Sequence, residues 1–392
     1  MILQYTIQMK IQSKLPNLGT TIFSVMSALA NEVGAINLSQ GFPNYECDAR
    51  LLDLVSHYLK KGMNQYAPMP GVPVLTQRLA AKIETLYGTA YNPATEITVT
   101  PGATEALFSA IMAFVHPGDE VIVIEPAYDC YVPSIELAGG KAVPYALRGP
   151  EWKVDWVELG KLISPKTRMI MINTPHNPVG TILKDSDMQA LQKLVEGTDI
   201  IVLSDEVYEH MVFDGQPHCS VMRYPALRSR SLAVFSFGKT LHATGWKMGY
   251  IVGDEQLMRE FRKVHQFNVF SVNTPIQYAI ADYLEDSSVY NSLPAMMQHK
   301  RDLFLNLIED SPFNCIPSQG TYFQLADYSE ISDESDTDFA IRMTKEFGVA
   351  VIPISVFYTN QVDNKAVRFC VAKTDETLTA AAERICKVGA KV

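Results

Sequence analysis

Short runs of apolar and β-branched residues alternate with helical segments through the middle of the chain. The clearest runs span 97–100, 121–124, 168–172, 200–203 and 231–235. Continuous runs of this kind are typical of strands buried on both faces of a parallel sheet. Parallel strands need long crossover connections, which the intervening helical segments supply. We therefore expect an α/β fold with a mostly parallel sheet between two layers of helices.

The pattern changes towards the C-terminus, where strands are predicted at 320–325 and 367–371 and helices at 339–347 and 376–388. These shorter elements indicate a smaller α+β domain. A chain of 392 residues has room for two domains. We expect a large domain over 46–285 and a small domain over 286–392, with an N-terminal segment, 1–45, packed against the small one.

The composition of the chain limits which ligands it can bind and in which cellular compartment it is expected. The net charge is −10 and no Lys/Arg cluster is present, which argues against a nucleic-acid ligand. No apolar stretch reaches about 18 residues, and residues 1–10 lack the apolar core of a signal peptide. The six cysteines are scattered without a C-x-x-C pair, so we expect neither disulfides nor a metal site. These features predict a cytoplasmic protein.

Polar residues follow several of the predicted strands, at the edge where parallel α/β sheets bind their ligands. Gly102 and Thr104 lie at a strand-to-helix junction, which suits an anion because backbone N–H groups point outwards there. Tyr128 follows the next strand and could stack on a flat ring. Asn177, in an Asn-Pro turn, offers an amide donor. Each of these residues alone is also compatible with ordinary turn, cap or core structure.

Asp205 follows the buried run 200–203, and a carboxylate there needs a partner such as a protonated pyridine nitrogen. Tyr208 lies three residues further on and could bond to the phenolic oxygen of the same ring. Arg368, on a predicted strand of the small domain, is a candidate for a two-point grip on a carboxylate. Taken singly, Asp205 also suits a helix cap and Arg368 a surface position.

The stretch after the run 231–235 carries the strongest chemistry. Lys239 follows a buried strand, where burial can lower the pKa of its amine and make it a nucleophile towards a carbonyl. Ser236 lies three residues before it and Lys247 eight residues after it, and both could bind a phosphate. These groups together suit a phosphorylated aldehyde cofactor held as a Schiff base. A single lysine in a loop would carry no functional meaning. Here six separate features of the chain each supply a group that the same cofactor or its substrate needs.

With these motifs assembled, the chain resembles the fold-type I aminotransferases that use pyridoxal phosphate. Within them it is similar to the subgroup of kynurenine/glutamine transaminases and bacterial methionine aminotransferases. The resemblance extends from about residue 13 almost to the C-terminus. It rests on the segments 37–43, 64–68, 102–105, 173–178, 204–209, 236–240, 244–250 and 367–369. It implies a seven-stranded, mostly parallel sheet sandwiched by helices.

The resemblance also assigns roles to individual residues. Lys239 would bind the cofactor aldehyde and later move the proton between substrate and cofactor. Asp205 would pair with the pyridine nitrogen, Asn177 and Tyr208 with the ring hydroxyl, and Tyr128 would stack on the ring. The phosphate would be bound by Gly102, Ala103, Thr104, Ser236 and Lys247, and by Tyr66 of a neighbouring subunit, which implies a homodimer with shared active sites.

For the substrate, the resemblance implies that Arg368 and Asn177 bind the α-carboxylate near Gly41. Phe42 and Phe270 would help to wall the side-chain pocket. The chain departs from the mammalian kynurenine enzymes at Ser271, where those enzymes carry His. This difference favours methionine and other large neutral amino acids, in a ping-pong transamination with a 2-oxo acid.

Other functions were compatible with parts of the pattern. The same site could catalyse β-elimination from cysteine S-conjugates or transamination of kynurenine. A transcription regulator built on this fold is disfavoured because no DNA-binding segment accompanies the acidic chain. A dinucleotide-dependent dehydrogenase is disfavoured because no G-x-G-x-x-G follows an early strand.

Overall fold

A computed structural model describes residues 11–389. Its main feature is a seven-stranded sheet with the order β2-β8-β7-β6-β5-β3-β4, in which only β8 runs against the others. The sheet is therefore mostly parallel, as the sequence predicts. Its strands are β2 (Ile97–Thr100), β3 (Glu120–Glu125), β4 (Lys141–Ala146), β5 (Thr167–Asn173), β6 (Ile201–Asp205), β7 (Ser231–Ser236) and β8 (Gly249–Gly253).

Helices cover both faces of this sheet. Successive side chains of a strand point to opposite faces, so in β5 Met169 and Met171 pack on one side and Ile170 and Ile172 on the other. One face is covered by α4 (Ala103–Phe114), α5 (Tyr131–Leu137) and α10 (Glu255–Asn268). The opposite face is covered by α3 (Pro73–Tyr87), α6 (Trp156–Gly160), α7 (Asp185–Val195), α8 (Pro225–Arg228) and α11 (Thr274–Tyr283).

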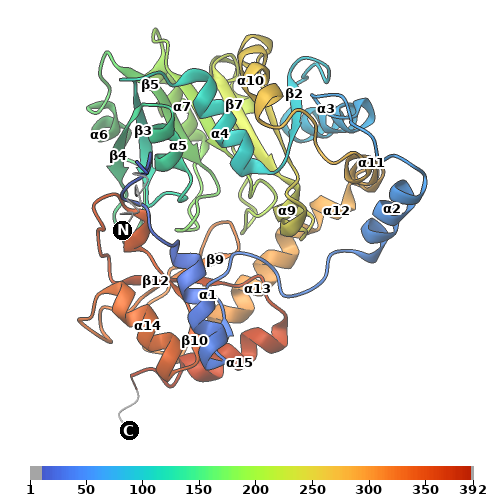
Figure 1. Ribbon diagram of the computed structural model, residues 1–392. Coiled ribbons are helices and arrows are strands. Elements are labelled where there is room, and N and C mark those ends of the chain that lie inside the picture. Colours follow the sequence, from blue (N-terminus) through green and yellow to red (C-terminus); the bar gives the residue numbers. More distant parts are fainter. Residues whose placement is uncertain (1–10, 390–392) are drawn as a thin grey trace, which may run out of the picture.

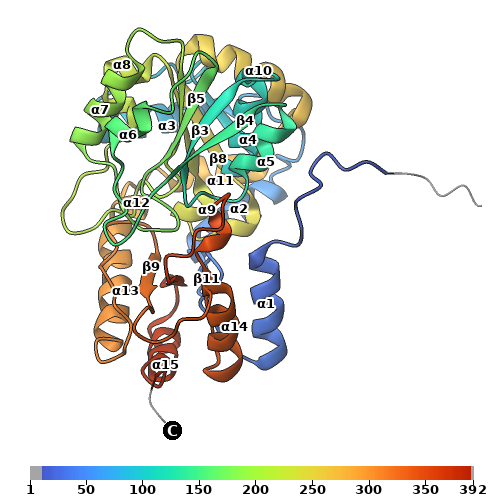
Figure 2. The ribbon, with the colours of Figure 1, turned by 90° about the vertical axis from the view of Figure 1, so that its left-hand side faces the viewer.

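A smaller α+β unit lies below the sheet in Figures 1 and 2. Its antiparallel sheet has the order β11-β12-β9, from β9 (Phe323–Asp327), β11 (Ile352–Pro353) and β12 (Ala366–Cys370). Its helices are α13 (Leu293–Leu307), α14 (Asp336–Glu346) and α15 (Asp375–Ile385). From the N-terminal segment, α1 (Ile22–Val33) packs against α14, and β1 (Ile36–Asn37) pairs in parallel with β10 (Val349–Ala350). Residues 1–10 of that segment lie outside the described residues.

Some element boundaries differ from the sequence prediction. Helix α10 ends at Asn268 and α11 begins at Thr274, because Phe270 has a φ of +70° and Pro275 lies in the first turn of α11. The strand expected at 320–325 begins at Phe323, since Thr321 has a φ of +69°. The remaining helical elements are α2 (Ala49–Lys60), α9 (Phe237–Thr240), α12 (Ser288–Asn291), η1 (Val221–Arg223), η2 (Thr244–Trp246) and η3 (Ser355–Phe357).

Three further observations concern residues 11–389. None of their helices is both long and apolar enough to cross a membrane. No group of three His, Cys, Asp or Glu side chains among them could hold a metal ion. The cysteines are free thiols.

A buried ion pair ties α3 to the segment that follows β6. Lys82 Nζ lies 2.5 Å from Glu209 Oε1, and both residues are less than a tenth exposed. Tyr250 OH lies 3.0 Å from each of these two atoms, and Tyr87 donates to the second carboxylate oxygen. This network joins α3, β8 and the segment next to Tyr208. It therefore holds the segment that follows β6 in place at the carboxyl edge of the sheet.

We expect Lys82→Met to destabilise the protein by about 3–5 kcal/mol, because it leaves the Glu209 carboxylate buried without its cation. The urea midpoint followed by far-ultraviolet circular dichroism measures the loss. The control is Lys153→Met, which breaks the exposed Lys153–Glu151 pair and should change stability by no more than about 0.5 kcal/mol. Equal effects of the two substitutions would contradict the expectation.

Candidate active site

One cavity of about 230 Å³ lies between the carboxyl edge of the large sheet and the small unit. It is lined by every residue that the sequence assigns to the site except Tyr66 and Phe270. The strands explain this convergence, because β2, β3, β5, β6 and β7 all end at the same edge, and each is followed by one of these residues.

One end of the cavity is rich in N–H donors. Gly102, with a φ of +84°, is the N-cap of α4, so the first N–H groups of that helix face the cavity. A Cβ on Gly102 would lie 3.5 Å from Lys247 Nζ, which places this ammonium beside the helix start. A Cβ on Gly249 would lie 2.6 Å from Phe235 O and 3.0 Å from Ala103 N. Only glycine therefore allows β8 to approach α4 this closely.

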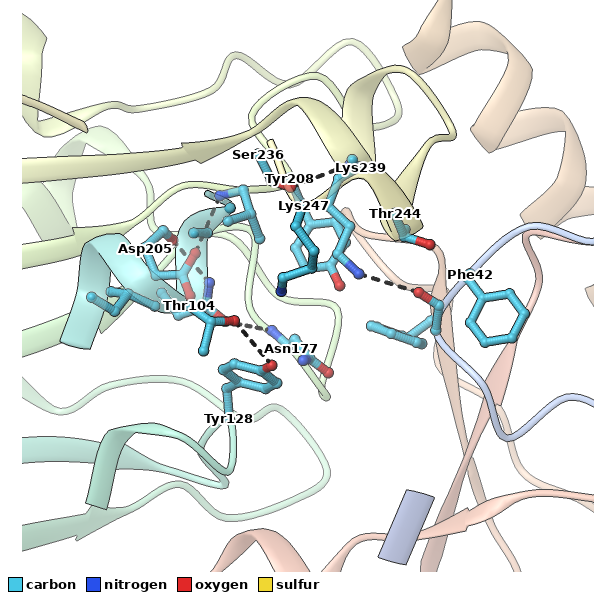
Figure 3. A pocket seen from close by; sticks show the side chains of 18 of the residues that line it. Phe42, Thr104, Tyr128, Asn177, Asp205, Tyr208, Ser236, Lys239, Thr244 and Lys247 are labelled. Atoms are coloured by element: carbon cyan, nitrogen blue, oxygen red, sulfur yellow. Dashed lines mark hydrogen bonds between the residues drawn. The ribbon is translucent and has the colours of Figure 1, made fainter. Parts of the chain in front are cut away.

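Ser236 and Thr104 complete the donor-rich end. Ser236 is the N-cap of α9, and its Oγ accepts a hydrogen bond from Lys239 N at 3.3 Å. Thr104 Oγ1 lies 3.5 Å from Tyr128 OH, and Figure 3 shows the two side chains next to each other. Burial raises the pKa of Tyr128 to about 12, so its hydroxyl stays protonated. A cation, hydroxyl groups and a helix N-terminus together make a site for a multiply charged anion.

Asp205 ends β6 and is 4% exposed. Its Oδ2 accepts a hydrogen bond from Tyr131 OH at 2.6 Å, and its Oδ1 accepts one from Val207 N at 3.2 Å. Burial raises the pKa of the Asp205 carboxyl to about 6, while these two hydrogen bonds lower it. The carboxylate is thus oriented from both sides and ionised near neutral pH.

Lys239 lies on the short helix α9, so its side chain projects from the end of β7 into the cavity. Its Nζ donates to Tyr322 OH at 2.8 Å and to Gly41 O at 3.2 Å. Burial lowers the pKa of Lys239 to about 8, and the positive charges of Arg368 and Lys247 act in the same direction. At neutral pH a larger fraction of this amine is therefore neutral and nucleophilic than of an exposed lysine.

Arg368 lies on β12 and is 1% exposed, so its charge is held inside the protein. Its Nη1 donates to Asn177 Oδ1 at 2.8 Å and its Nη2 to Ser39 O at 3.1 Å, while Nε has no hydrogen-bond partner among residues 11–389. The guanidinium carbon lies 3.8 Å from the centre of the Phe323 ring. Burial lowers the pKa of Arg368 to about 10, so it remains a cation at neutral pH. An incoming carboxylate is the natural partner for this group.

Backbone contacts fix the Asn177 loop. Asn173 Nδ2 donates to Asp205 O at 2.8 Å, and Asn173 Oδ1 accepts from Asn177 N at 2.7 Å. Because Asn177 Oδ1 is bound to Arg368, the amide NH₂ of Asn177 is the group left to contact a ligand. Tyr208 is buried on the neighbouring segment, with its ring edge-to-face against Tyr322 at 5.2 Å.

Tyr66 and Phe270 lie outside this cavity. They form a separate pair, with ring centres 5.1 Å apart and exposed fractions of 81% and 47%. Ser271 lies beside them and donates to Ala67 O at 2.9 Å. Phe270 therefore does not line the cavity of its own chain, and the role that the resemblance implies for it stays a prediction.

The sequence prediction missed several contributors. Tyr131 and Tyr322 bond directly to Asp205 and Lys239, and Phe23 and Gln40 line the cavity from the N-terminal segment. Tyr131 lies only three residues after Tyr128, which was the one signal in the sequence that could have pointed to it. The others come from the far ends of the chain, and no local pattern links them to Lys239.

Comparison with known proteins supports a single family. The model for aminotransferases of class I and II matches residues 33–385. Methionine aminotransferase of Escherichia coli strain K12 is 49% identical over 375 residues, which cover 95% of this chain and 97% of that protein. Mouse kynurenine–oxoglutarate transaminase 1 is 33% identical and covers 91% of this chain and 93% of its own. The crystal structure of an Escherichia coli protein with a methionine aminotransferase function has a TM-score of 0.95 at 48% identity, over 97% of this chain and all of that one.

We expect the Lys239 amine in the ligand-free protein to titrate near pH 8, because burial favours its neutral form. Exposed lysines titrate near 10.4, so Lys239 should react preferentially with an acylating reagent at pH 8. The initial rate of labelling, followed by mass spectrometry from pH 6 to 11, gives the midpoint. A midpoint equal to that of exposed lysines would contradict the buried environment.

Proposed function

Because the chain belongs to the class I and II aminotransferase family, its activity is transamination, and we propose that its preferred donor is methionine or another large neutral amino acid. The observation that carries the choice of donor is the 49% identity with a methionine aminotransferase over nearly the whole chain. The acceptor is a 2-oxo acid.

The walls near Arg368 support this donor class. Phe23, Phe42 and Phe323 line the cavity on that side. Aromatic rings make favourable contacts with apolar side chains and with thioether sulfur. The charged side chains of the cavity, Asp205, Lys239, Lys247 and Arg368, have other roles in this proposal. A large neutral side chain is therefore favoured over an acidic one.

We propose pyridoxal 5′-phosphate as the cofactor, because the residues that line the cavity match its phosphate, its ring nitrogen and its ring oxygen. The N–H groups of Ala103 and Thr104, with Ser236 and Lys247, provide the donors that a phosphate requires. Asp205 provides a buried carboxylate for a protonated ring nitrogen. Tyr128 provides an aromatic ring, and Asn177 and Tyr208 provide donors for a ring oxygen.

When bound, the cofactor supplies an electrophilic aldehyde carbon and an electron-withdrawing ring, which weaken the Cα–H bond of an attached amino acid. Lys239 Nζ, whose pKa burial lowers to about 8, would act as the base that takes the proton from the substrate Cα. Asp205 keeps the ring nitrogen protonated. Arg368 and Asn177 bind the α-carboxylate and so orient the Cα–H bond towards Lys239.

The cavity lies between the two units of the fold. Gly41 and Phe42, on the loop after β1, close the cavity on the side of the small unit. The first half of the reaction releases a 2-oxo acid, and the second half returns the amino group to another 2-oxo acid. The alternation of the two halves is a ping-pong mechanism.

We further propose a homodimer, because Tyr66 and Phe270 form an exposed aromatic pair with no place in their own cavity. In the partner's cavity, Tyr66 would bond to the phosphate and Phe270 would wall the substrate side chain. We also retain the division into residues 1–45, 46–285 and 286–392 as a proposal, and a cytoplasmic location, for which the free thiols are a supporting observation.

A panel of amino donors tests the proposed substrate. With one 2-oxo acid as acceptor, methionine should give a kcat/KM at least about tenfold above that of aspartate, because aromatic walls favour a neutral side chain and leave a carboxylate unpaired. Kynurenine and a cysteine S-conjugate belong in the same panel, with pyruvate and ammonia release as the readout for β-elimination. A preference for aspartate, or elimination without an acceptor, would refute the proposal.

With every donor, Lys239→Ala should lose about 10²–10⁴-fold in rate and should lack the visible absorbance of lysine-bound cofactor.

Mixed dimers test the shared site. Tyr66→Ala should weaken phosphate binding by about 1.5–3 kcal/mol and so lower activity at limiting cofactor. Lys239→Ala should be inactive. In a mixed dimer, one site combines Lys239 of the first variant with Tyr66 of the second and is intact. Statistical mixing should therefore restore roughly a quarter of wild-type activity. Activity no higher than the mean of the two variants would place Tyr66 in its own chain's site.

A further inference from the structure

Tyr322 has the closest contact with the Lys239 amine of any side chain, yet the mechanism above gives it no role. Its hydroxyl oxygen accepts a hydrogen bond from Lys239 Nζ at 2.8 Å and donates its own proton to Gly41 O at 2.5 Å. The residue is 1% exposed and immediately precedes β9 of the small unit. Burial raises the pKa of Tyr322 well above its usual value, so the hydroxyl remains a neutral group.

These contacts constrain the direction of the amine. A neutral amine has two N–H bonds and one lone pair. In this structure Nζ has two acceptors, Tyr322 OH at 2.8 Å and Gly41 O at 3.2 Å. When both N–H bonds are used in this way, the tetrahedral geometry of nitrogen turns the lone pair away from them. Lys239 lines the cavity, so a lone pair turned away from these two acceptors is available to a ligand there.

The oxygen of Tyr322 is itself fixed. Its ring packs edge-to-face against Tyr208 at 5.2 Å and against Phe323 at 4.9 Å. Its backbone carbonyl accepts a hydrogen bond from Val371 N at 2.9 Å. A Cβ on Gly41 would lie 2.9 Å from the Phe323 ring, so the Gly41 carbonyl is also held close to this cluster. The two acceptors of Lys239 Nζ, Tyr322 OH and Gly41 O, are therefore held in fixed positions.

We propose that Tyr322 is a positioning residue for proton transfer, which together with the Gly41 carbonyl holds the released Lys239 amine with its lone pair directed at the substrate Cα. This inference rests on the proposed transamination. In the step it serves, the Cα–H bond breaks and the proton joins the Nζ lone pair. The bonding electrons stay on the substrate carbon and are drawn towards the cofactor ring.

The two acceptors, Tyr322 OH and Gly41 O, come from the other unit of the fold than Lys239 itself. Lys239 belongs to α9 at the edge of the large sheet, whereas Tyr322 and Gly41 belong to the small unit and the N-terminal segment that packs on it. The orientation of the base therefore depends on the small unit lying against the large one. A merely structural tyrosine would contribute packing and leave the amine's direction unchanged.

The test compares Tyr322→Phe with the wild type in a single half-reaction with methionine. The phenylalanine keeps the ring and removes only the hydroxyl oxygen that accepts from Lys239. We expect the rate constant to fall about tenfold, since small misplacement of a reacting group is costly. The deuterium isotope effect with α-deuterated methionine should rise, because proton transfer becomes slower than the other steps. The dissociation constant of methionine should change by less than about twofold, because the groups that bind the carboxylate are intact.

A second readout needs no turnover. With pyridoxamine phosphate bound to the full-length protein, Lys239 is free, and its pKa is measured from the pH dependence of acylation by mass spectrometry. An acceptor oxygen favours the charged form of the amine, so Tyr322→Phe should lower the pKa of Lys239 relative to wild type. Tyr322→His, whose ring nitrogen can accept the same hydrogen bond, should recover part of the lost rate.

Tyr328→Phe is the matched control. Tyr328 is also fully buried in the small unit, and its hydroxyl donates to Glu334 O at 3.0 Å, away from the cavity. All variants are compared at equal cofactor content. The proposal is overturned if Tyr322→Phe leaves the isotope effect and the Lys239 pKa unchanged, or if Tyr328→Phe alters both to the same extent. A wild-type protein without any half-reaction would refute the proposed function instead, and the labelling result would still decide the role of Tyr322.

Discussion

The site depends on keeping charged groups out of water at the edge of a sheet. Asp205, Lys239 and Arg368 are each buried or nearly so, and a buried charge without a partner is costly. Each therefore recruits groups from other elements. Tyr131 and Val207 hold Asp205, Asn177 and Ser39 hold Arg368, and Tyr322 and Gly41 hold Lys239. The same burial shifts the pKa values towards those that proton transfer at neutral pH requires.

Much of the large sheet and of its binding edge follows from local sequence. Asp205 and Lys239 stand out because each follows a buried strand, and parallel strands bring their carboxyl ends to one edge. Gly102 stands out because a glycine before a helix exposes N–H groups. The motif spacing around Lys239 then identifies the family that the comparisons support.

The rest could not be read from local patterns. Tyr322 and Phe23 reach the cavity only because the two ends of the chain fold together, and no periodicity reports a contact between residues so far apart. The break at Phe270 depends on a left-handed backbone conformation that a phenylalanine rarely adopts. Phe270 lies on the surface, outside the cavity of its own chain. Its residue type could not predict this, because apolar residues occur both in the core and on the surface.

The pairing of β1 with β10 gives the site an order of assembly. Lys239 and Lys247 belong to one short connection between the adjacent strands β7 and β8, so their contacts are local in sequence. Ser39 and Gly41, which follow β1, meet Arg368 and Tyr322 only after more than two hundred further residues have been added. During synthesis the chain is made from its N-terminus, so the donor-rich end of the cavity forms while Arg368 and Tyr322 are still missing. A nascent chain therefore completes its anion-binding end long before it completes the end that meets a carboxylate.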